Sequence, residues 1–241
     1  MIGFALAGGG TSYGLSDGLG SGGSEMFQAA AYSFTRFDAA YVSAGVAYAG
    51  HWGSTDRQLS VAGADRLSAT FFASNFGGRI EGGYRFAGPS AADGPQYGLT
   101  PYAALQGQAF SMPSYGETGG LGPSPFALAY SAQTTTTVRT ELGAWVDHTI
   151  ALKDATLVLR ARAAWAHDYF DNRATVTAAF RSLPDSIFTV AGAVPVKDSA
   201  LLSAGAWLRF ENNVSIGAKF DGEFASRSQT YAGTATLRYT W

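Results

Sequence analysis

The chain ends in Tyr231-Ala232-Gly233-Thr234-Ala235-Thr236-Leu237-Arg238-Tyr239-Thr240-Trp241, and these last eleven residues decide how the rest is interpreted. Two sets of residues alternate without a break. One set holds the aromatic and larger aliphatic side chains, and the other is mostly threonine. A period of two is the pattern of a β-strand with one apolar and one polar face. Because an aromatic residue closes the chain, we expect the apolar face to meet lipid and the polar face to meet a lumen.

The composition of the chain fits such strands. Its 241 residues suit one all-β domain, so we expect residues 1–241 to form a single β-barrel domain. Hydrophobic residues make up 46%, yet the mean hydropathy is only +0.02. A transmembrane barrel has this composition because every second residue is polar. Charged residues make up 14%, below the roughly 25% of soluble domains, as a lipid-facing surface would produce.

Other classes of protein are disfavoured by what the sequence lacks. It has no cysteine, which excludes disulfides and thiolate metal sites. Its formal net charge of -2 argues against a nucleic-acid partner. No metal-ligand spacing, nucleotide-binding loop or nucleophile motif occurs, so we expect no metal and no cofactor. Residues 1–7 do not form a signal peptide, which predicts part of a longer precursor or a truncated reading frame.

The alternation recurs upstream and predicts about ten strands. The expected strands are Ile2–Gly9, Glu25–Phe34, Ala39–Trp52, Leu67–Phe86, Leu99–Phe110, Ala129–Ile150, Ala155–Tyr169, Ser199–Phe210, Val214–Phe224 and Tyr231–Trp241. The glycine-rich or polar segments expected to form loops are Gly8–Ser24, Gly53–Asp65, Ser111–Phe126 and Ala225–Thr230. The longest connection, Phe170–Lys197, contains two strand-like pieces and is expected to form a hairpin or a plug-like excursion.

The expected connections alternate in length, with tight turns after the second, sixth and eighth strands. Short turns at one end and long loops at the other are typical of outer-membrane barrels, with the short turns in the periplasm. We therefore expect an all-β, antiparallel, up-and-down transmembrane β-barrel in the bacterial outer membrane, in contact with its lipid. A soluble β-sandwich is the alternative. It is disfavoured because several strands exceed the usual five or six residues and carry their charges on one face.

Face alternation also assigns two groups of residues. Aromatic residues near the periplasmic strand ends are expected to belong to an interfacial girdle, namely Tyr32, Phe34, Tyr84, Phe86 and Phe210, together with Tyr239 and Trp241. Charged residues are expected to form a cluster on the lumen side, namely Arg79, Glu81, Arg139, Glu141, Arg160, Arg162, Lys219, Asp221 and Glu223.

Several stretches resemble one family in its own order along nearly the whole chain. They are Arg79–Phe86, Leu99–Gln106, Arg139–Ala144, Leu159–His167, Phe188–Ala193, Lys219–Phe224 and Leu237–Trp241. On these stretches the chain resembles the C-terminal β-barrel translocator domain of autotransporters, the type V secretion proteins of Gram-negative bacteria. The resemblance is closest to the alphaproteobacterial group.

The resemblance implies a function and several partners. A translocator domain anchors an N-terminal passenger domain and helps to export it. The family's barrel has twelve strands around a helix, so we expect this chain to lack the first two strands, the helix and the passenger. Leu237, Tyr239 and Trp241 would form the signal recognised by the barrel assembly machinery. The charged cluster would hold the helix or let an unfolded passenger slide. Alternatively, its charges satisfy one another across neighbouring strands.

Two other functions are alternatives, a passive outer-membrane pore and a rim hydrolase of the outer-membrane protease type. The latter uses Asp and His at the rim, and the chain's histidines are His51, His148 and His167. His148 falls in the lipid-facing set. His167 and Asp168 are adjacent, so on a strand they point to opposite faces. We therefore expect no catalytic residue and no enzyme.

Overall fold

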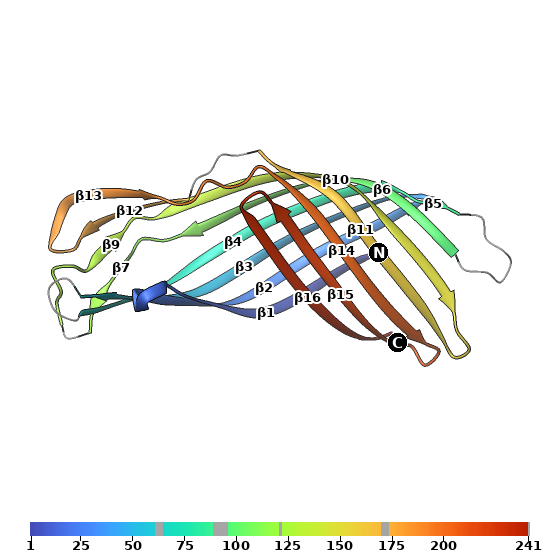
Figure 1. Cartoon of the computed structure of the whole chain (residues 1–241), viewed down its shortest axis with the longest axis horizontal. Helices are drawn as coiled ribbons and strands as arrows, with labels where there is room; N and C mark the ends of the chain where they lie inside the picture. Colours follow the sequence, from blue (N-terminus) through green and yellow to red (C-terminus); the bar gives the residue numbers. More distant parts are fainter. Residues whose placement is uncertain (61–64, 89–95, 121, 170–173, 241) are drawn as a thin grey trace.

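The computed structural model describes residues 1–60, 65–88, 96–120, 122–169 and 174–240, which form long antiparallel strands (Figure 1). The long strands are β1 (Ile2–Gly14), β2 (Gly20–Phe37), β3 (Ala40–Leu59), β4 (Asp65–Tyr84), β6 (Gln96–Met112), β10 (Gln133–Ala151), β11 (Ala155–Asp168), β14 (Asp198–Phe210), β15 (Val214–Ala225) and β16 (Ser228–Tyr239). Short strands are β5 (Phe86–Ala87), β7 (Tyr115–Gly116), β8 (Thr118–Gly119), β9 (Leu128–Tyr130), β12 (Thr175–Phe180) and β13 (Leu183–Ala191). A single 3-10 turn, η1 (Ser16–Gly18), joins β1 to β2. Within these ranges, no helix has the length and apolar character to cross a membrane.

The long strands form one sheet in which neighbours in sequence are neighbours in space. Its order is β1-β2-β3-β4-β6-β10-β11-β14-β15-β16, and every pairing along it is antiparallel. This confirms the predicted up-and-down architecture of about ten strands. The sheet curls so that β14 to β16 lie in front of β1 to β4 in Figure 1. In the described part of the chain, β1 and β16 are edges that do not pair with each other.

The curled sheet has a convex face that is apolar and exposed. Val46, Ile80, Leu105 and Leu142 lie on it in four successive strands, each between 47% and 54% exposed. A soluble protein rarely exposes a continuous apolar surface of this extent. The opposite, concave face carries the polar set, as the alternation predicts.

The prediction that Gly8–Ser24 forms a loop is wrong. The paired residues of β1 and β2 run from Ile2 opposite Ser33 to Gly14 opposite Ser21, so only residues 15–19 connect the two strands. Strand pairing uses backbone N–H and C=O groups, which glycine and serine possess like any other residue. The apolar alternation weakens there, but the hairpin continues.

Two other predicted loops are also largely strand. β3 and β4 pair as far as Leu59 opposite Asp65, so most of Gly53–Asp65 is strand. Only Ser226 and Arg227 connect β15 to β16, where Ala225–Thr230 was expected to form a loop. At about 3.3 Å per residue, β3 and β4 are each roughly 65 Å long. That is about twice the ~30 Å hydrocarbon core of a bilayer, so these hairpins extend beyond any membrane that they cross.

A small second sheet stands at the end of the molecule opposite the tight turns, at the left of Figure 1. Its order is β13-β12-β9-β7. β12 and β13 confirm the hairpin expected in the long connection. The segment Ser111–Phe126 contains β7 and β8 as well as turns, and the predicted sixth strand is divided into β9 and β10. β9 leaves the main sheet because it pairs with β7 and β12.

A buried carboxylate, Glu117, joins this small sheet to the main one. Its side chain is 2% exposed and accepts two hydrogen bonds from Arg57 of β3, at 3.0 and 2.6 Å. It also accepts bonds from the backbone N–H of Leu128 and the hydroxyl of Tyr130. Burial, followed by the nearby Glu117 charge, raises the pKa of Tyr130, which therefore keeps its proton.

Candidate functional site on the concave face

The register brings the predicted charged cluster together at the middle of the concave face. Arg79 of β4 lies opposite Gln106 of β6, and Gln106 lies opposite Arg139 of β10. In the next row, Glu81 and Glu141 flank Ala104. Because Ala104 is small, a guanidinium has room to lie between the two carboxylates.

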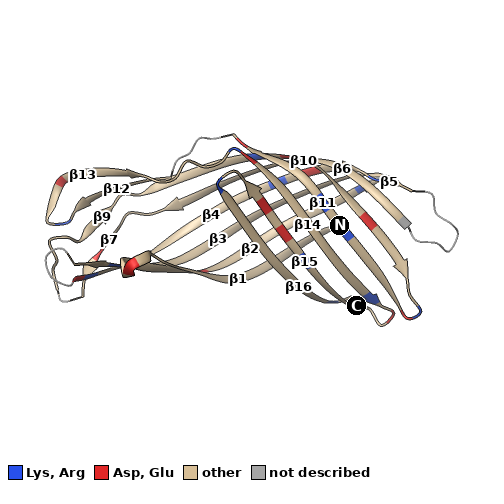
Figure 2. Cartoon of the chain, in the orientation of Figure 1, with Lys and Arg blue, Asp and Glu red and all other residues tan. Residues whose placement is uncertain are grey.

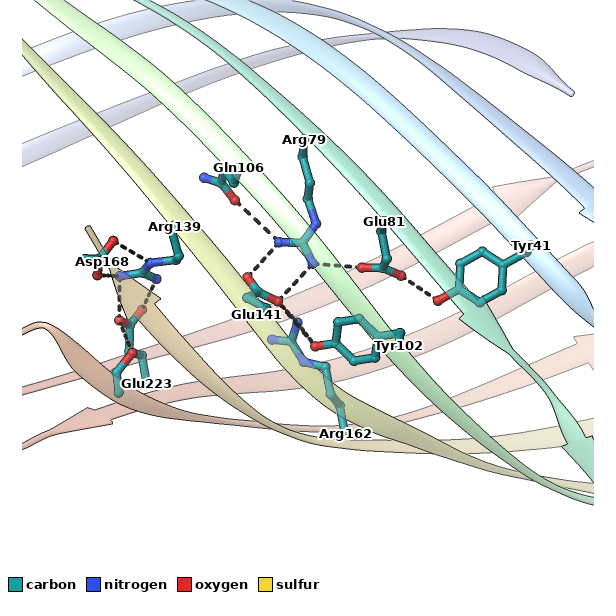
Figure 3. A network of polar contacts seen from close by, with 11 residues as sticks. Tyr41, Arg79, Glu81, Tyr102, Gln106, Arg139, Glu141, Arg162, Asp168 and Glu223 are labelled. Atoms are coloured by element: carbon teal, nitrogen blue, oxygen red, sulfur yellow. Dashed lines mark hydrogen bonds and ion pairs between the residues drawn. The ribbon is translucent and has the colours of Figure 1, made fainter. Parts of the chain in front are cut away.

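Arg79 occupies the centre of this network (Figure 3). Its guanidinium donates to both oxygens of Glu141, at 2.6 and 2.9 Å, and to Glu81 Oε2 at 2.7 Å. The hydroxyl of Tyr41 donates to Glu81 at 2.7 Å, and that of Tyr102 donates to Glu141 at 3.2 Å. Bidentate arginine–carboxylate pairs are among the stronger polar contacts in proteins. This network therefore ties β3, β4, β6 and β10 together.

A second group surrounds Arg139, near the small sheet's end of the lumen wall. Arg139 binds Asp168 at 2.9 and 2.7 Å and Glu223 at 3.2 and 3.0 Å. Ser199 donates to Glu223 at 2.9 Å. Glu223 belongs to β15, three strands away from β10, so this contact follows from the curvature of the sheet (Figure 3).

The remaining members of the predicted cluster lie on the same face. Arg162 is 3.6 Å from Glu141, and Lys219 is 2.9 Å from Asp221. Arg160 lies with its guanidinium 4.0 Å above the ring of Trp145, a cation–π contact. The structure thus places all nine predicted residues on the concave face.

Sequence reasoning missed several partners of the cluster. Tyr41, Tyr102 and Asp168 complete its hydrogen bonds, and Arg85 forms a separate bidentate pair with Asp147 at 3.2 and 2.6 Å. The alternation assigns these residues to the inward set. Which of them touch depends on the register and the curvature, which the sequence does not show.

The predicted aromatic girdle is divided between the two faces. Tyr84 and Phe86 lie on the convex face with rings 4.8 Å apart, and Phe210 shares that face through its pairing with Ala155. The girdle prediction is wrong for Tyr32 and Phe34. They lie opposite Gly45 and Ser43 on the concave face, and Phe34 stacks on Tyr41. The face of a β2 residue is set by its register with β3, and a register that differs by one residue exchanges the faces.

The predicted assembly signal lies at the free edge of the sheet. Leu237 and Tyr239 lie on the convex face of β16, 78% and 60% exposed. Trp241 lies outside the described residues. Tyr239 pairs with Val214, the first residue of β15, and therefore lies at the end of the sheet that has the tight turns.

The three histidines lie apart. His51 makes an edge contact with Phe110 on the concave face, and His148 stacks on Tyr97 at 4.1 Å on the convex face. His167 also faces outward, where its Nδ1 is 2.9 Å from Asp198, a partner that the sequence did not reveal. Among the described residues, no group of three His, Cys, Asp or Glu side chains could hold a metal ion.

Comparison with known proteins finds a matching family model and similar solved structures. A family model described as Autotransporter beta-domain matches residues 1–221. The chain is also similar in structure to the transport unit of the autotransporter AIDA-I from Escherichia coli, with a TM-score of 0.53 and 12% sequence identity. That alignment covers 100% of this chain and 90% of the other, and at this identity it shows the fold alone. A search of curated proteins found no match.

Proposed function

The chain belongs to the autotransporter beta-domain family, and on that premise we propose that its charged concave face is the path of a passenger polypeptide across the outer membrane. The chain is an outer-membrane β-barrel translocator of type V secretion in Gram-negative bacteria, and its cargo is a passenger domain. A translocator domain of this kind is not itself catalytic.

The chemistry of the concave face supports this path. An extended polypeptide in transit exposes backbone N–H and C=O groups that need hydrogen-bonding partners. Beside Arg79 the face has a hollow of about 380 Å³, lined by Gln28, Asn75, Gln106 and Gln108 with small residues between them. Amides both donate and accept, so they can exchange partners with a moving chain.

The paired charges serve both interpretations that the sequence left open. Arg79 between two carboxylates is locally compensated, which stabilises the barrel wall. The same pairing leaves a hydrophilic surface whose charges are already compensated, so a passing chain is not bound strongly. The convex face cannot provide such a path because it is apolar and exposed.

The experiment compares two alanines of β3 that point to opposite faces. Ala47 lines the hollow, whereas Ala44 lies opposite Ile80 on the convex face. In the full-length protein with a short epitope as passenger, Ala47→Trp should reduce surface display several-fold, and Ala44→Trp should not. Heat-modifiable gel migration checks that both variants fold. Equal display by both folded variants would count against the path.

Lipid and the barrel assembly machinery are the proposed partners of the convex face. Leu237 and Tyr239 project from the edge strand β16, where an assembly factor can reach them, and Trp241 completes the motif in the sequence. Tyr239→Ala should lower the amount of assembled barrel, and Tyr231→Ala, on the same face of β16, should not. Tyr84, Phe86 and Phe210 are proposed to lie at the periplasmic lipid interface.

We also propose that residues 1–241 act as one barrel domain that further strands complete. An unpaired strand edge in lipid is costly because each unsatisfied backbone group costs several kcal/mol there. β1 and β16 are both such edges in the described structure. Cysteines placed in series along the two edges test this in the assembled full-length protein. Efficient β1–β16 disulfides would show direct closure and overturn the proposal.

The two alternative functions have less support. The His167–Asp198 pair lies on the convex face, away from any substrate in the lumen, so a rim hydrolase has no site there. A passive pore predicts steady conductance but no effect of Ala47→Trp on passenger display.

A further inference from the structure

We propose that the periplasmic mouth of the concave face carries a basic site that captures acidic segments of the entering polypeptide. The site, here called the basic mouth, consists of Arg36, Arg209 and Arg238 at the rim and of Arg160 further in on the same face. The inference rests on the proposed path along the concave face and names the chemistry that the path favours at its entrance.

Two of these arginines lie in one row across the last three strands. Arg209 of β14 is opposite Ser215 of β15, and Ser215 is opposite Arg238 of β16. With neighbouring strands about 4.8 Å apart, their backbones are roughly 10 Å apart. Ser215 between them is small, so both guanidinium groups can reach one extended ligand.

The other two arginines share this face. Arg36 lies opposite Tyr41, whose hydroxyl binds Glu81 in the central network, so Arg36 also points to the concave side. Arg160 lies opposite Gly205, four residues deeper than Arg209 on the same face, with its guanidinium above the ring of Trp145. Figure 2 shows blue segments at the end of β14 near the C-terminus and in the neighbouring turn.

The basic mouth differs from the rest of the concave face in its charge balance. Arg79, Arg85, Arg139, Arg162 and Lys219 each lie within 4.0 Å of a carboxylate. Within the described ranges, no ion pair includes Arg36, Arg160, Arg209 or Arg238. At the other end of the lumen, Arg139 faces both Asp168 and Glu223.

Nearby acids do not neutralise the basic mouth. Asp147 is already held by Arg85 through two hydrogen bonds. Asp38, Asp154 and Glu211 are exposed turn residues, and in the described structure none forms an ion pair with the four arginines. The mouth therefore presents uncompensated positive charge toward the lumen.

An acidic polypeptide segment fits this arrangement better than a lipid headgroup does. The arginines face the concave side, whereas lipid meets the convex side. A guanidinium binds a carboxylate in a planar, bidentate geometry, which selects acidic side chains. Exposed ion pairs are individually weak, so several together can hold a segment and still release it during transit.

The test measures binding of labelled extended peptides to the full-length protein refolded in a nonionic detergent. The peptides alternate Ser with Glu, or Ser with Lys, at equal length, and fluorescence anisotropy gives Kd. We expect the Glu peptide to bind more tightly than the Lys peptide. Arg209→Gln/Arg238→Gln should raise its Kd about tenfold, consistent with the loss of several weak ion pairs. Added salt should also raise the Kd of the Glu peptide, because it screens the ion pairs.

The matched control removes two arginines at the opposite end of the molecule. Arg66→Gln/Arg227→Gln loses the same charge and should change Kd less than twofold. Equal binding of the Glu and Lys peptides, or an equal loss in the control, would overturn the basic mouth. Heat-modifiable migration and a circular dichroism spectrum establish that each variant is folded.

The basic mouth and the translocation path can fail separately. Normal surface display of the epitope passenger without preference for the Glu peptide would overturn the basic mouth alone. Selective, salt-sensitive peptide binding combined with equal display by Ala47→Trp and Ala44→Trp would overturn the path and keep the acidic-segment site.

Discussion

Glu141 shows at the scale of one residue how the concave wall tolerates buried charge. Its side chain is only 6% exposed, yet it contacts Arg79, Arg162 and Tyr102. A buried carboxylate without partners would cost several kcal/mol. Here each carboxylate oxygen has at least one donor. The contacts of Glu141 therefore link β10 to β4, β6 and β11.

Replacing Glu141 by Gln should therefore destabilise the barrel. The change removes the carboxylate charge that faces Arg79 and Arg162. Glu81 still forms an ion pair with Arg79, so the positive charge of Arg79 stays partly compensated. We expect a loss of about 1–3 kcal/mol in the free energy of unfolding, less than for a fully buried pair. Urea titration of the refolded protein, with tryptophan fluorescence as the signal, measures this free energy.

Glu211→Gln is the matched control, because Glu211 lies exposed in the turn between β14 and β15. Its effect should stay within about 0.5 kcal/mol, as for most surface substitutions. A similar midpoint for both variants would contradict the structural role assigned to Glu141.

At the scale of elements, the long hairpins and the small sheet are held by separate contacts. The hairpins continue through their own backbone pairing. The small sheet depends on Glu117 and on the ring stack in which Tyr115 lies between Phe71 and Tyr130, at 4.5 and 4.6 Å. The sheet can therefore loosen while the barrel strands remain paired.

Glu117→Gln tests this separation. The substitution keeps the shape but loses the ion pair with Arg57, and a hydrogen bond to a charged group contributes about 1.5–3 kcal/mol. We expect local opening to rise about tenfold or more. Limited trypsin digestion should then cut at Arg181 faster, with the barrel strands protected.

Arg66→Gln is the control for this prediction. Its pair with Asp56 is largely exposed, since the Arg66 side chain is 72% accessible, and such pairs contribute little. Unchanged cleavage at Arg181 in Glu117→Gln would show that the ring stack alone holds the sheet.

At the scale of the whole molecule, the two faces of one sheet differ in chemistry. The convex face is apolar over the middle of the sheet, while the concave face carries the large charged cluster. A charge should therefore be costly on one face and tolerated on the other.

Leu142→Arg places a charge near the middle of β10 on the convex face, where Leu142 is 54% exposed. At a bilayer midplane this costs about 2–4 kcal/mol. Thr234→Arg, near the middle of β16 on the concave face, should cost less than about 1 kcal/mol. Reversible unfolding in lipid vesicles measures the free energy of unfolding of both variants. Equal costs would show that the convex face does not meet lipid.

The sequence by itself determined the order of the long strands and the faces of most of their residues. A period of two needs only local information, so residues such as Arg79, Glu141 and Leu142 could be assigned to a face directly. The resemblance in ordered stretches likewise identified the family that the comparison confirms. The same local signal failed where apolarity was absent, as in Gly8–Ser24, because backbone pairing does not need apolar side chains.

Only the tertiary structure decided which residues meet. The contacts of Arg139 with Glu223 and of Arg57 with Glu117 join residues 84 and 60 positions apart. They depend on register and on curvature, which are properties of the whole sheet. The same holds for Tyr32 and Phe34, whose face follows from their pairing with β3 and not from their own strand. Period two predicts that a residue points inward or outward, but its partners are fixed only when the sheet curls.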